Sequence, residues 1–442
     1  MAHALEPVKE EPVGEALVVG GGIAGITAAL ELANMGVRVH LVEKRPAIGG
    51  NMAKLTKVFP TLDDAQSLLK PRMDAVWEHP NIDLLTLAEV QEVSGQAGNH
   101  RVRVYVKPRG VDVKKCTACG MCAKACPVEV PDEFNEGLST RKAIYLPYPE
   151  AIPPAYVVDF SACTMCGECE KVCPTKAINL KDAGKTIDLN VGAVILALGY
   201  DLYDAKRLEN YGYGIYKDVI TMMALERMIS KSGPTGGQLK KADEGEVRKI
   251  ALALCAGSRD KNHVPYCSRI CCMYSVKLAY VLKTVFGLDV TVYYIDIRAA
   301  GKGYEDLYWK AQEAGVVFIR GRVAEIYKGK DGKLVVRAED TLTSEVREEE
   351  YDIVALAVPI VPPRDLKELA EKMKLPVDEY GFVVEKHQKV DPVESQVPGI
   401  FVCGCVLGPK DIRDTVAEAL GAAAKAATLL KSGATSSSPQ LY

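Results

Sequence analysis

The spacing of the cysteines constrains this chain more than any other feature of its sequence. The chain has 14 cysteines, and eight of them fall between residues 116 and 173 in two runs of the same pattern, Cys-x2-Cys-x2-Cys-x3-Cys-Pro. Short spacings of this kind let three thiolates converge on one face of a [4Fe–4S] cubane. A zinc site or a chance pairing of cysteines is the alternative, and two full-length tandem matches argue against it. The sequence therefore predicts iron–sulfur chemistry.

The pattern also predicts which cysteine binds which cluster. In bacterial-type two-cluster ferredoxins, the fourth cysteine of each run binds the cluster of the other run. One cluster is then expected on Cys116, Cys119, Cys122 and Cys173. The other is expected on Cys163, Cys166, Cys169 and Cys126.

Composition excludes several classes of protein and places the chain in a reducing compartment. At 442 residues, with 48% hydrophobic and 26% charged residues, it resembles an ordinary globular protein of two or three domains. A net charge of −3 predicts no nucleic-acid partner and no anionic membrane surface. No apolar run is long enough to predict a membrane span, and residues 1–14 do not resemble a signal peptide. Thiol ligands favour a cytoplasmic location, with any membrane association made through partner subunits.

A dinucleotide-binding motif begins at residue 16. The segment Ala16–Glu43 reads as a strand, a glycine turn, a helix and a second strand that ends in an acidic residue. Its glycines permit a tight turn, close approach to a pyrophosphate and packing of the helix on the strand, while Glu43 can accept a ribose hydroxyl. The Gly-Gly continuation at residues 49–50 is similar to that of FAD-binding proteins. The expected cofactor-binding residues here are Gly20, Gly22, Ile23, Ala24, Gly25, Glu43, Lys44 and Gly50.

Two later segments are expected to complete the flavin domain. Val191–Gly199 is similar to the strand and turn of flavoproteins with two dinucleotide-binding domains. This similarity predicts that the ferredoxin runs are an insertion into the flavin domain. It also predicts that Gly199 lies at the cofactor. Near the C-terminus, Gly404 and Cys405 stand in a run that lines the FAD ribityl chain in flavin reductases, although aspartate is usual at the second position. The helix expected at 416–430 would point its positive end at the flavin.

The stretch from Lys249 predicts a second α/β unit. Strands are expected at 250–254, 290–297 and 316–319, and helices at 272–285 and 304–314. A nicotinamide-binding unit would carry glycines directly after the first strand, but the loop at 255–260 has no G-x-G-x-x-G pattern. Asp296 and Arg298 could contact a nucleotide, yet without a phosphate loop they read as solvated charges at a strand end.

A second group of cysteines occupies that loop and the start of the next helix. Its members, Cys255, Cys267, Cys271 and Cys272, match neither a zinc ribbon nor a ferredoxin run. Adjacent cysteines at a helix N-terminus can both face one metal site. A redox thiol pair and buried small apolar residues are the alternatives, and the spacing alone leaves them open.

The chain resembles the family of heterodisulfide reductase A subunits, which includes the A subunit of quinone-interacting membrane-bound oxidoreductase. The motifs that carry the resemblance are the dinucleotide frame, the paired cysteine runs, Tyr266–Tyr274 (with Cys-Cys-Met-Tyr) and Gly301–Glu305 (Gly-Lys-Gly-Tyr-Glu). The resemblance implies an α/β, thioredoxin-reductase-like flavoprotein with two dinucleotide-binding domains and an inserted two-cluster ferredoxin (α+β) domain. The expected segments are a tail at 1–14, FAD-binding parts at 15–108, 186–245 and 346–431, the ferredoxin insert at 109–185, the NAD(P)H-domain-like unit at 246–345 and a tail at 432–442.

The same resemblance implies a function. FAD and [4Fe–4S] clusters would exchange electrons within a larger oxidoreductase complex, with other subunits of that complex as partners. One form of this function is bifurcation or confurcation of electrons at the flavin. Cys255, Cys267, Cys271 and Cys272 would hold a third cluster. The alternatives are the A subunit of a quinone-interacting complex linked to sulfate or sulfur metabolism, and a self-contained NAD(P)H-dependent flavin oxidoreductase.

Lys277 is the expected catalytic residue. It follows Cys272 by a little over one helical turn, so its ammonium could lie near the flavin and bias its one-electron potentials. A surface lysine without a role is the alternative.

Overall fold

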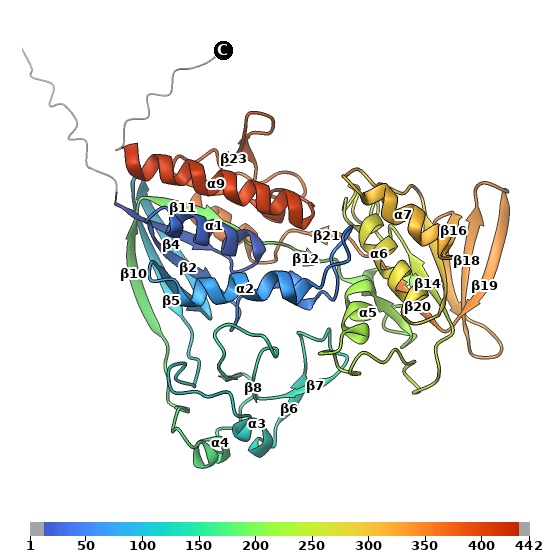
Figure 1. Ribbon diagram of the computed structural model, residues 1–442, viewed down its shortest axis with the longest axis horizontal. Helices are drawn as coiled ribbons and strands as arrows, with labels where there is room; N and C mark the ends of the chain where they lie inside the picture. The colour runs from blue at the N-terminus through green and yellow to red at the C-terminus, as the bar shows by residue number, and fades with distance from the viewer. Residues whose placement is uncertain (1–12, 433–442) are drawn as a thin grey trace, which may run out of the picture.

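The computed structural model describes residues 13–432, and the expected terminal segments 1–14 and 432–442 lie almost entirely outside them. Two units built on separate parallel sheets stand side by side, and an insert lies below the first of them in Figure 1. We call these the first unit, the second unit and the insert, which spans residues 107–184.

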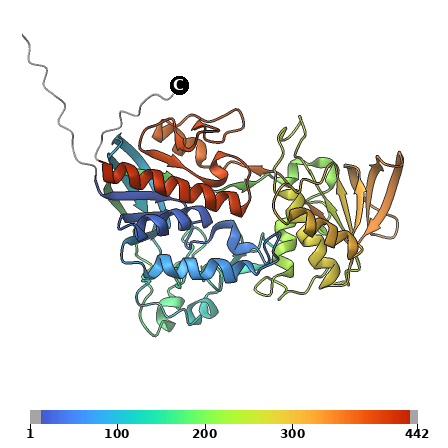
Figure 2. The same cartoon turned by 45° about the horizontal axis from the view of Figure 1, so that its top comes forward.

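The first unit is built on a seven-stranded sheet in the order β22-β23-β24-β11-β1-β2-β3. Its strands from β24 to β3 are parallel, and β1 and β11 are almost wholly buried because both faces of the sheet are covered. Helices α1 and α9 lie together on one face (Figure 2). The bounds are β1 Glu15–Val19, α1 Ile23–Asn34, β2 Arg38–Glu43, β3 Ile82–Thr86, β11 Ala193–Leu196, β22 Glu385–His387, β23 Asp391–Ser395, β24 Ile400–Val402 and α9 Ile412–Ser432.

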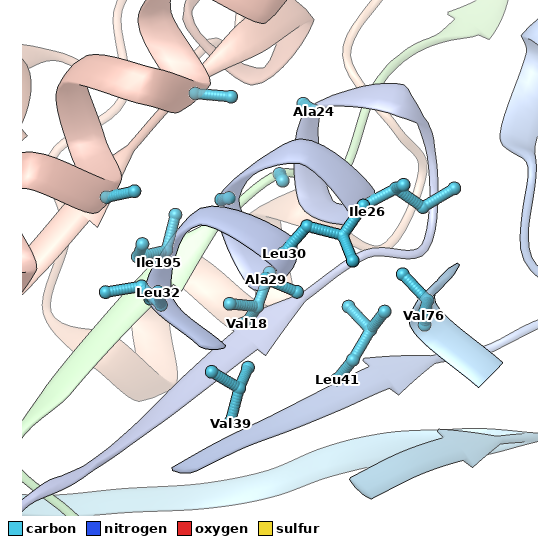
Figure 3. Close-up of a cluster of buried hydrophobic side chains, with 14 of the residues drawn as sticks. Val18, Ala24, Ile26, Ala29, Leu30, Leu32, Val39, Leu41, Val76 and Ile195 are labelled. Carbon is cyan, nitrogen blue, oxygen red and sulfur yellow. The ribbon is translucent and has the colours of Figure 1, made fainter. Parts of the chain in front are cut away.

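The core beneath α1 holds the glycine turn in place. Figure 3 shows Ile26 and Leu30 of α1 directed toward Val18 and Leu41 of the sheet, with Val76 of α2 (Ala65–Glu78) beside them. Of these, only Leu30 is measurably exposed, at 9%. Burial on this scale stabilises each large side chain by about 1.5–3 kcal/mol, which fixes the N-terminus of α1 against the sheet.

A three-stranded antiparallel sheet covers the opposite face and carries the insert. Its strands are β4 (Ala88–Gln96), β5 (Asn99–Val106) and β10 (Lys185–Val191), in the order β10-β5-β4. Val106 pairs directly with Lys185. The chain therefore leaves the first unit and returns to it at neighbouring points, as an insertion requires.

The insert has two short helices and two small hairpins. Helices α3 and α4 each contain the third cysteine of a run and lie at the far end of the insert from the first unit (Figure 1). Tyr148, Ala151 and Ile152 belong to the same apolar core as α1, so the insert shares the core of the first unit. The bounds are α3 Met121–Ala125, β6 Glu129–Pro131, β7 Thr140–Lys142, β8 Ile144–Tyr145, β9 Val157–Val158 and α4 Glu168–Val172.

The second unit has a five-stranded parallel sheet in the order β13-β20-β14-β15-β16. Helices α6 and α7 are packed together beside it, and a separate antiparallel sheet of β17, β18 and β19 forms its outer end (Figure 1). The strands and helices predicted from Lys249 onward are confirmed. The bounds are β13 Val219–Thr221, α5 Met222–Ile229, β14 Lys249–Ala253, α6 Cys271–Thr284, β15 Asp289–Tyr294, α7 Tyr304–Glu313, β16 Val317–Arg320, β17 Val323–Lys328, β18 Leu334–Asp340, β19 Glu345–Tyr351 and β20 Ile353–Leu356.

The sheet topology differs from the expected segment boundaries at two points. Strands β13 and β20 fall in the ranges 186–245 and 346–431 expected for the first unit, but both belong to the sheet of the second unit. Short apolar strands carry no mark of the sheet they will join, because that choice depends on long-range pairing. The remaining elements are β12 Asp201–Leu202, β21 Ile360–Val361, α8 Leu366–Met373 and the 3₁₀ helices η1 Gly50–Lys54, η2 Ala205–Arg207, η3 Glu209–Tyr211 and η4 Gly404–Leu407.

No helix between residues 13 and 432 combines the length and the apolar character that crossing a bilayer demands.

Candidate functional site

A cavity of about 510 Å³ is lined by residues of both the first and the second unit. The first unit contributes the glycine turn after β1, the end of β2 and the start of α9. The second unit contributes Met222, Cys271, Tyr274 and Tyr304. Of the residues expected to bind the cofactor, those that line the cavity are Gly20, Gly22, Ile23, Ala24, Glu43, Lys44, Gly50, Gly199 and Cys405.

The three glycines of the turn have different surroundings. Gly20 has φ +111°, and a Cβ there would lie 2.3 Å from the carbonyl oxygen of Ala197. A Cβ on Gly25 would lie 1.8 Å from the carbonyl oxygen of Gly20, so Gly25 serves helix packing and does not line the cavity. Beside Gly22 the nearest atom to such a Cβ is 4.0 Å away, on Gly50. The open space at the N-terminus of α1 is where a pyrophosphate would fit.

Glu43 lies at the cavity wall and is 7% exposed. Its two carboxylate oxygens accept hydrogen bonds from the backbone N–H groups of Gly21 (2.6 Å) and Arg45 (2.8 Å). These bonds hold the carboxylate beside the glycine turn, and each oxygen keeps a lone pair for a ribose hydroxyl.

The other end of the cavity meets α9. Ile412, Arg413 and Thr415 of its first turn line the cavity, so the positive end of this helix faces the space. Gly404 does not line the cavity; its N–H donates to Glu418 (2.9 Å). With a phosphate cradle at one end and a helix N-terminus at the other, the residues present fit FAD.

Sequence reasoning missed several residues that line this cavity. Asn51 follows the Gly-Gly pair and Tyr200 follows Gly199, so position next to a motif was the available signal for both. Burial raises the pKa of Tyr200, which keeps its hydroxyl protonated. Met222 and Tyr304 come from the second unit, and only the tertiary structure brings them to the cavity.

The two ferredoxin runs fold into similar loops. Ala118 and Met165, each two residues after the first cysteine of its run, have φ of +53° and +57°, and α3 and α4 follow directly. The N–H of Met165 donates to Cys163 Sγ (3.4 Å). Between residues 13 and 432, no three or more His, Cys, Asp or Glu side chains are grouped so as to hold a single metal ion. Loops with backbone donors aimed at sulfur fit iron–sulfur clusters.

The fourth cysteine of the first run lies with the second run. Cys126 lines a small cavity together with Cys163, Cys166 and Cys169. Burial raises the pKa of Cys169 to about 11. In the other set, burial raises the pKa of Cys122 to about 12. Buried thiols of this kind become thiolates when a metal replaces the proton.

The second cysteine group is brought together at the N-terminus of α6. The pKa of Cys271 is raised chiefly by its hydrogen bond with Cys272 and then by burial. The nearby thiols of Cys255, Cys267 and Cys272 raise it further. That hydrogen bond lowers the pKa of Cys272 to about 7. Cys271 also lines the large cavity, so this group adjoins the candidate flavin site directly.

The backbone around Cys267 repeats the ferredoxin loop. Arg269, two residues after Cys267, has φ +59°, its N–H donates to Cys267 Sγ (3.3 Å), and α6 begins at Cys271. The arrangement at Cys163 and Met165 is the same. The sequence did not reveal this similarity, because the cysteine spacing at Cys267–Cys272 differs from that of the ferredoxin runs.

Asp296 and Arg298 lie at the end of β15. Asp296 forms ion pairs with Arg259 (2.9 Å) and Arg320 (3.8 Å) and is partly exposed. The ion pairs of Asp296 agree with its interpretation as a charge at a strand end, whereas Arg298 lies beside Cys272, whose pKa its backbone and its charge help to lower.

Lys277 is not a surface residue, and that alternative is wrong. Its side chain is 1% exposed, and Nζ lies 2.6 Å from Oε2 of Glu226, which is fully buried. Lys277 does not line the cavity among the described residues; its ammonium lies 4.6 Å from the ring centroid of Tyr274, which does. Burial lowers the pKa of Lys277 against the attraction of Glu226.

Comparison with known proteins gives two matching domain families. A family of FAD-dependent oxidoreductases matches residues 15–79, and a 4Fe–4S dicluster domain matches residues 115–185. Among solved structures, thioredoxin reductases from T. acidophilum and Lactococcus lactis are similar, each at 16% identity over 95% of this chain. Their TM-scores are 0.51 and 0.52, with 97% and 99% of those chains covered. These structures confirm the thioredoxin-reductase-like fold.

Relatives with higher identity extend over almost the whole chain. One of the iron–sulfur A subunits of CoB–CoM heterodisulfide reductase in Methanopyrus kandleri is 49% identical over 98% of this chain. The A subunit of the H(2):CoB-CoM heterodisulfide,ferredoxin reductase of Methanothermobacter marburgensis is 45% identical over 98%. In both cases the chain spans 67% of the relative's length. The A subunit of the ferredoxin/F(420)H(2)-dependent CoB-CoM heterodisulfide reductase of Methanosarcina acetivorans is 43% identical over 96% of this chain and 54% of its own.

Proposed function

The chain belongs to the family of heterodisulfide reductase A subunits, and we propose that it is the flavin-bearing electron-transfer subunit of a larger complex related to those reductases. It is an oxidoreductase that transfers electrons between FAD and [4Fe–4S] clusters. The observation that carries the proposal is the cavity between the units. Its wall contains both the glycine turn and Cys271, so the site for FAD adjoins a cysteine group.

In this proposal the protein binds FAD through those expected residues that line the cavity. Gly22 and the N-terminus of α1 receive the pyrophosphate, Glu43 receives the ribose, and the N-terminus of α9 lies at the flavin ring. FAD supplies the exchange of electron pairs, whereas the clusters accept and donate electrons singly. Residues of both units enclose the cavity and restrict the access of water to the ring.

The protein holds three clusters in this proposal. Two occupy the ferredoxin cysteines, with Cys126 and Cys173 each serving the cluster of the other run. The third occupies Cys255, Cys267, Cys271 and Cys272, and the ferredoxin-like backbone at Cys267–Cys271 supports it. Its position beside the cavity makes it the first acceptor or donor for the flavin. One cluster beside the flavin and two more in the insert offer separate acceptors for the two electrons of a pair, so we include bifurcation or confurcation in the proposal.

Lys277 has a positioning role in this proposal. The ion pair with Glu226 lies behind Tyr274, one layer of side chains away from the cavity. Thr56 also donates to Glu226 through its N–H (2.6 Å), between the cavity residues Leu55 and Lys57. This buried charge pair can therefore set the electrostatic field at the flavin.

Metal and flavin analysis of the purified protein tests the proposal. Three cubanes require about 12 irons per FAD, and two require about eight. Substitution Cys271→Ser should lower the count by about four irons and remove one signal from the electron paramagnetic resonance spectrum. Cys403→Ser is the matched control, because Cys403 is also buried and lies outside the three cysteine groups. About eight irons in the unaltered protein would show that the third cluster is absent.

A second test separates the rival function. Direct bleaching of the flavin by NAD(P)H in the isolated protein would favour a self-contained NAD(P)H oxidoreductase.

A further inference from the structure

One loop of the insert touches both units at once. It spans residues 132–137, between β6 and β7. Asn135 Oδ1 accepts a hydrogen bond from Nε of Arg227 in α5 of the second unit (2.9 Å). Glu136 pairs with Lys54 of the first unit (2.5 Å). We call Phe134, Asn135 and Glu136, with Lys54 and Arg227, the three-way joint.

Phe134 lies at the centre of this joint. Its ring stacks on Tyr148 at 4.8 Å between centroids and 12° between planes. The Arg227 guanidinium lies 4.8 Å from the ring centroid, and the Lys54 ammonium lies 5.9 Å from it. A phenyl ring in contact with two cations from different units holds both of them against the insert.

The joint is buried and well connected. Arg227 is 1% exposed and Lys54 is 9% exposed, so water screens neither charge effectively. Arg227 also donates to the carbonyl oxygens of Lys54 (3.2 Å) and Ser232 (3.2 Å). An arginine that binds a carbonyl of the first unit, a side chain of the insert and its own unit fixes all three to one another.

The joint connects the cluster sites with the flavin cavity. On the insert side, the loop follows β6, which begins three residues after Cys126. On the cavity side, Arg227 follows Glu226, whose partners are Thr56 and Lys277. Lys54 belongs to η1, whose residues Asn51 and Met52 line the cavity. A shift of the loop would therefore be transmitted to both sites.

The main attachments of the insert outside the joint reach the first unit. The β5–β10 pair and the hydrogen bond from the N–H of Ile48 to the carbonyl of Ile152 (2.9 Å) attach it on one side. These contacts fix the insert to the first unit. The three-way joint is a contact that also ties it to the second unit.

We propose that the three-way joint positions the ferredoxin clusters relative to the flavin cavity, with Arg227 as the positioning residue that joins the three parts. The inference rests on the proposed function, because FAD and the clusters must occupy the assigned sites. Electron transfer slows steeply as the distance between two redox centres grows, so a displacement of the insert would slow transfer between its clusters and the flavin.

Substitution Asn135→Ala in the full, cofactor-loaded chain tests the proposal without removing a buried charge. We expect faster hydrogen–deuterium exchange in residues 129–137 and unchanged FAD and iron contents. We expect electron transfer from photoreduced flavin to the ferredoxin clusters to become slower than in the unaltered protein. Asn135 Nδ2 also donates to Asp132 within the same loop (2.7 Å), so the transfer rate and not the hydrogen exchange reports loss of the contact with Arg227.

Asn179→Ala is the matched control. Asn179 is also a loop residue of the insert, but its side chain accepts a hydrogen bond from the N–H of Lys181 within the insert (3.1 Å). The control should leave the transfer rate and the exchange of residues 129–137 unchanged. Arg227→Lys provides a second test from the other side of the joint, with the same expected slowing.

Two outcomes would overturn the proposal. One is an unchanged transfer rate in Asn135→Ala and Arg227→Lys, with all cofactors retained. The other is equal hydrogen exchange of residues 129–137 in the unaltered and altered proteins. Failure of the proposed function would look different, because the unaltered protein itself would then lack FAD or the expected iron.

Discussion

Residues of one type do different work in this protein according to the atoms around them. Gly25 is required because the carbonyl of Gly20 occupies the place of a side chain, whereas the space beside Gly22 is open. The cysteines differ in the same way: Cys119 and Cys166 are exposed in their loops, whereas Cys403 is fully buried and outside the cluster groups. Identity in the sequence therefore gives a candidate role, and the neighbours decide it.

Alanine at two glycines separates cofactor binding from folding. Gly22→Ala should change the free energy of unfolding of the FAD-free protein little, and it should weaken FAD binding, because the methyl group enters the space of the pyrophosphate. Gly25→Ala should lower that free energy by about 1–3 kcal/mol through overpacking. Chemical denaturation and FAD titration measure the two effects. Equal loss of stability in both variants would contradict this separation.

His100 predicts a pH dependence of stability. It lies in β5, is 3% exposed, and its Nε2 has no hydrogen-bond partner between residues 13 and 432. Burial lowers the pKa of His100. The unfolded chain therefore binds this proton more tightly, and stability is complete above the ordinary pKa near 6.5 and falls as pH decreases below it.

The expected loss reaches at most about 1.4 kcal/mol per pH unit until the pKa of the folded state is passed. His100→Leu should remove this part of the pH dependence in denaturation experiments from about pH 7.5 to about pH 5.5. His387→Leu is the control, because His387 is exposed. An unaltered pH profile in the His100 variant would show that other groups cause it.

At the scale of elements, the N-termini of α1, α6 and α9 converge on the cavity. Gly22 precedes α1, Cys271 begins α6 and Ile412 begins α9, and all three line the cavity. Each helix offers unpaired N–H groups and a positive dipole end. Helices of this arrangement favour bound phosphate, thiolate and reduced flavin, all of which carry negative charge.

The buried pair between α5 and α6 should affect both stability and redox potential. Lys277→Met leaves the Glu226 carboxylate buried without its partner, which should cost about 3–5 kcal/mol. Glu226→Gln added to it keeps an acceptor for Thr56 and should recover much of that loss. Denaturation of the single and double variants measures this coupling.

Lys277→Met and Glu226→Gln, each made singly, should shift the flavin potential in opposite directions. Loss of the ammonium disfavours the reduced, more negative flavin, so Lys277→Met should lower the midpoint potential. Glu226→Gln alone should raise it. Redox titration of the bound flavin checks both signs, and an unchanged midpoint in Lys277→Met would rule out a role of Lys277 at the flavin.

At the scale of the whole molecule, the insert is part of the first unit and not an appended domain. Tyr148, Ala151 and Ile152 complete the core beneath α1, and Arg109 donates to the carbonyl of Pro46 (3.0 Å). Excision of residues 107–184, with Asn-Gly closing β5 and β10 as a hairpin, should still permit that hairpin because Val106 pairs with Lys185.

The excised protein should nevertheless be less stable. Exposure of the core around Ile48 and Met73 should lower the free energy of unfolding by about 3–6 kcal/mol, the equivalent of two large buried side chains. Denaturation and FAD binding measure the result. If the excised protein and the original, both without FAD, had the same free energy of unfolding, the insert would be an independent module.

Short-range patterns in the sequence predicted the chemistry and the local structure. Cluster ligands and the dinucleotide turn need particular residue types at fixed short spacings, so the cysteine runs and Gly20–Glu43 could be recognised directly. Helices and strands such as α6 and β14 followed from local patterns. Long-range packing decided which sheet β13 and β20 join, that Lys277 is buried with Glu226, and that Cys271 lines the candidate FAD cavity. These depend on contacts between residues far apart in the chain, and such contacts leave no periodic or short-range trace in a single sequence.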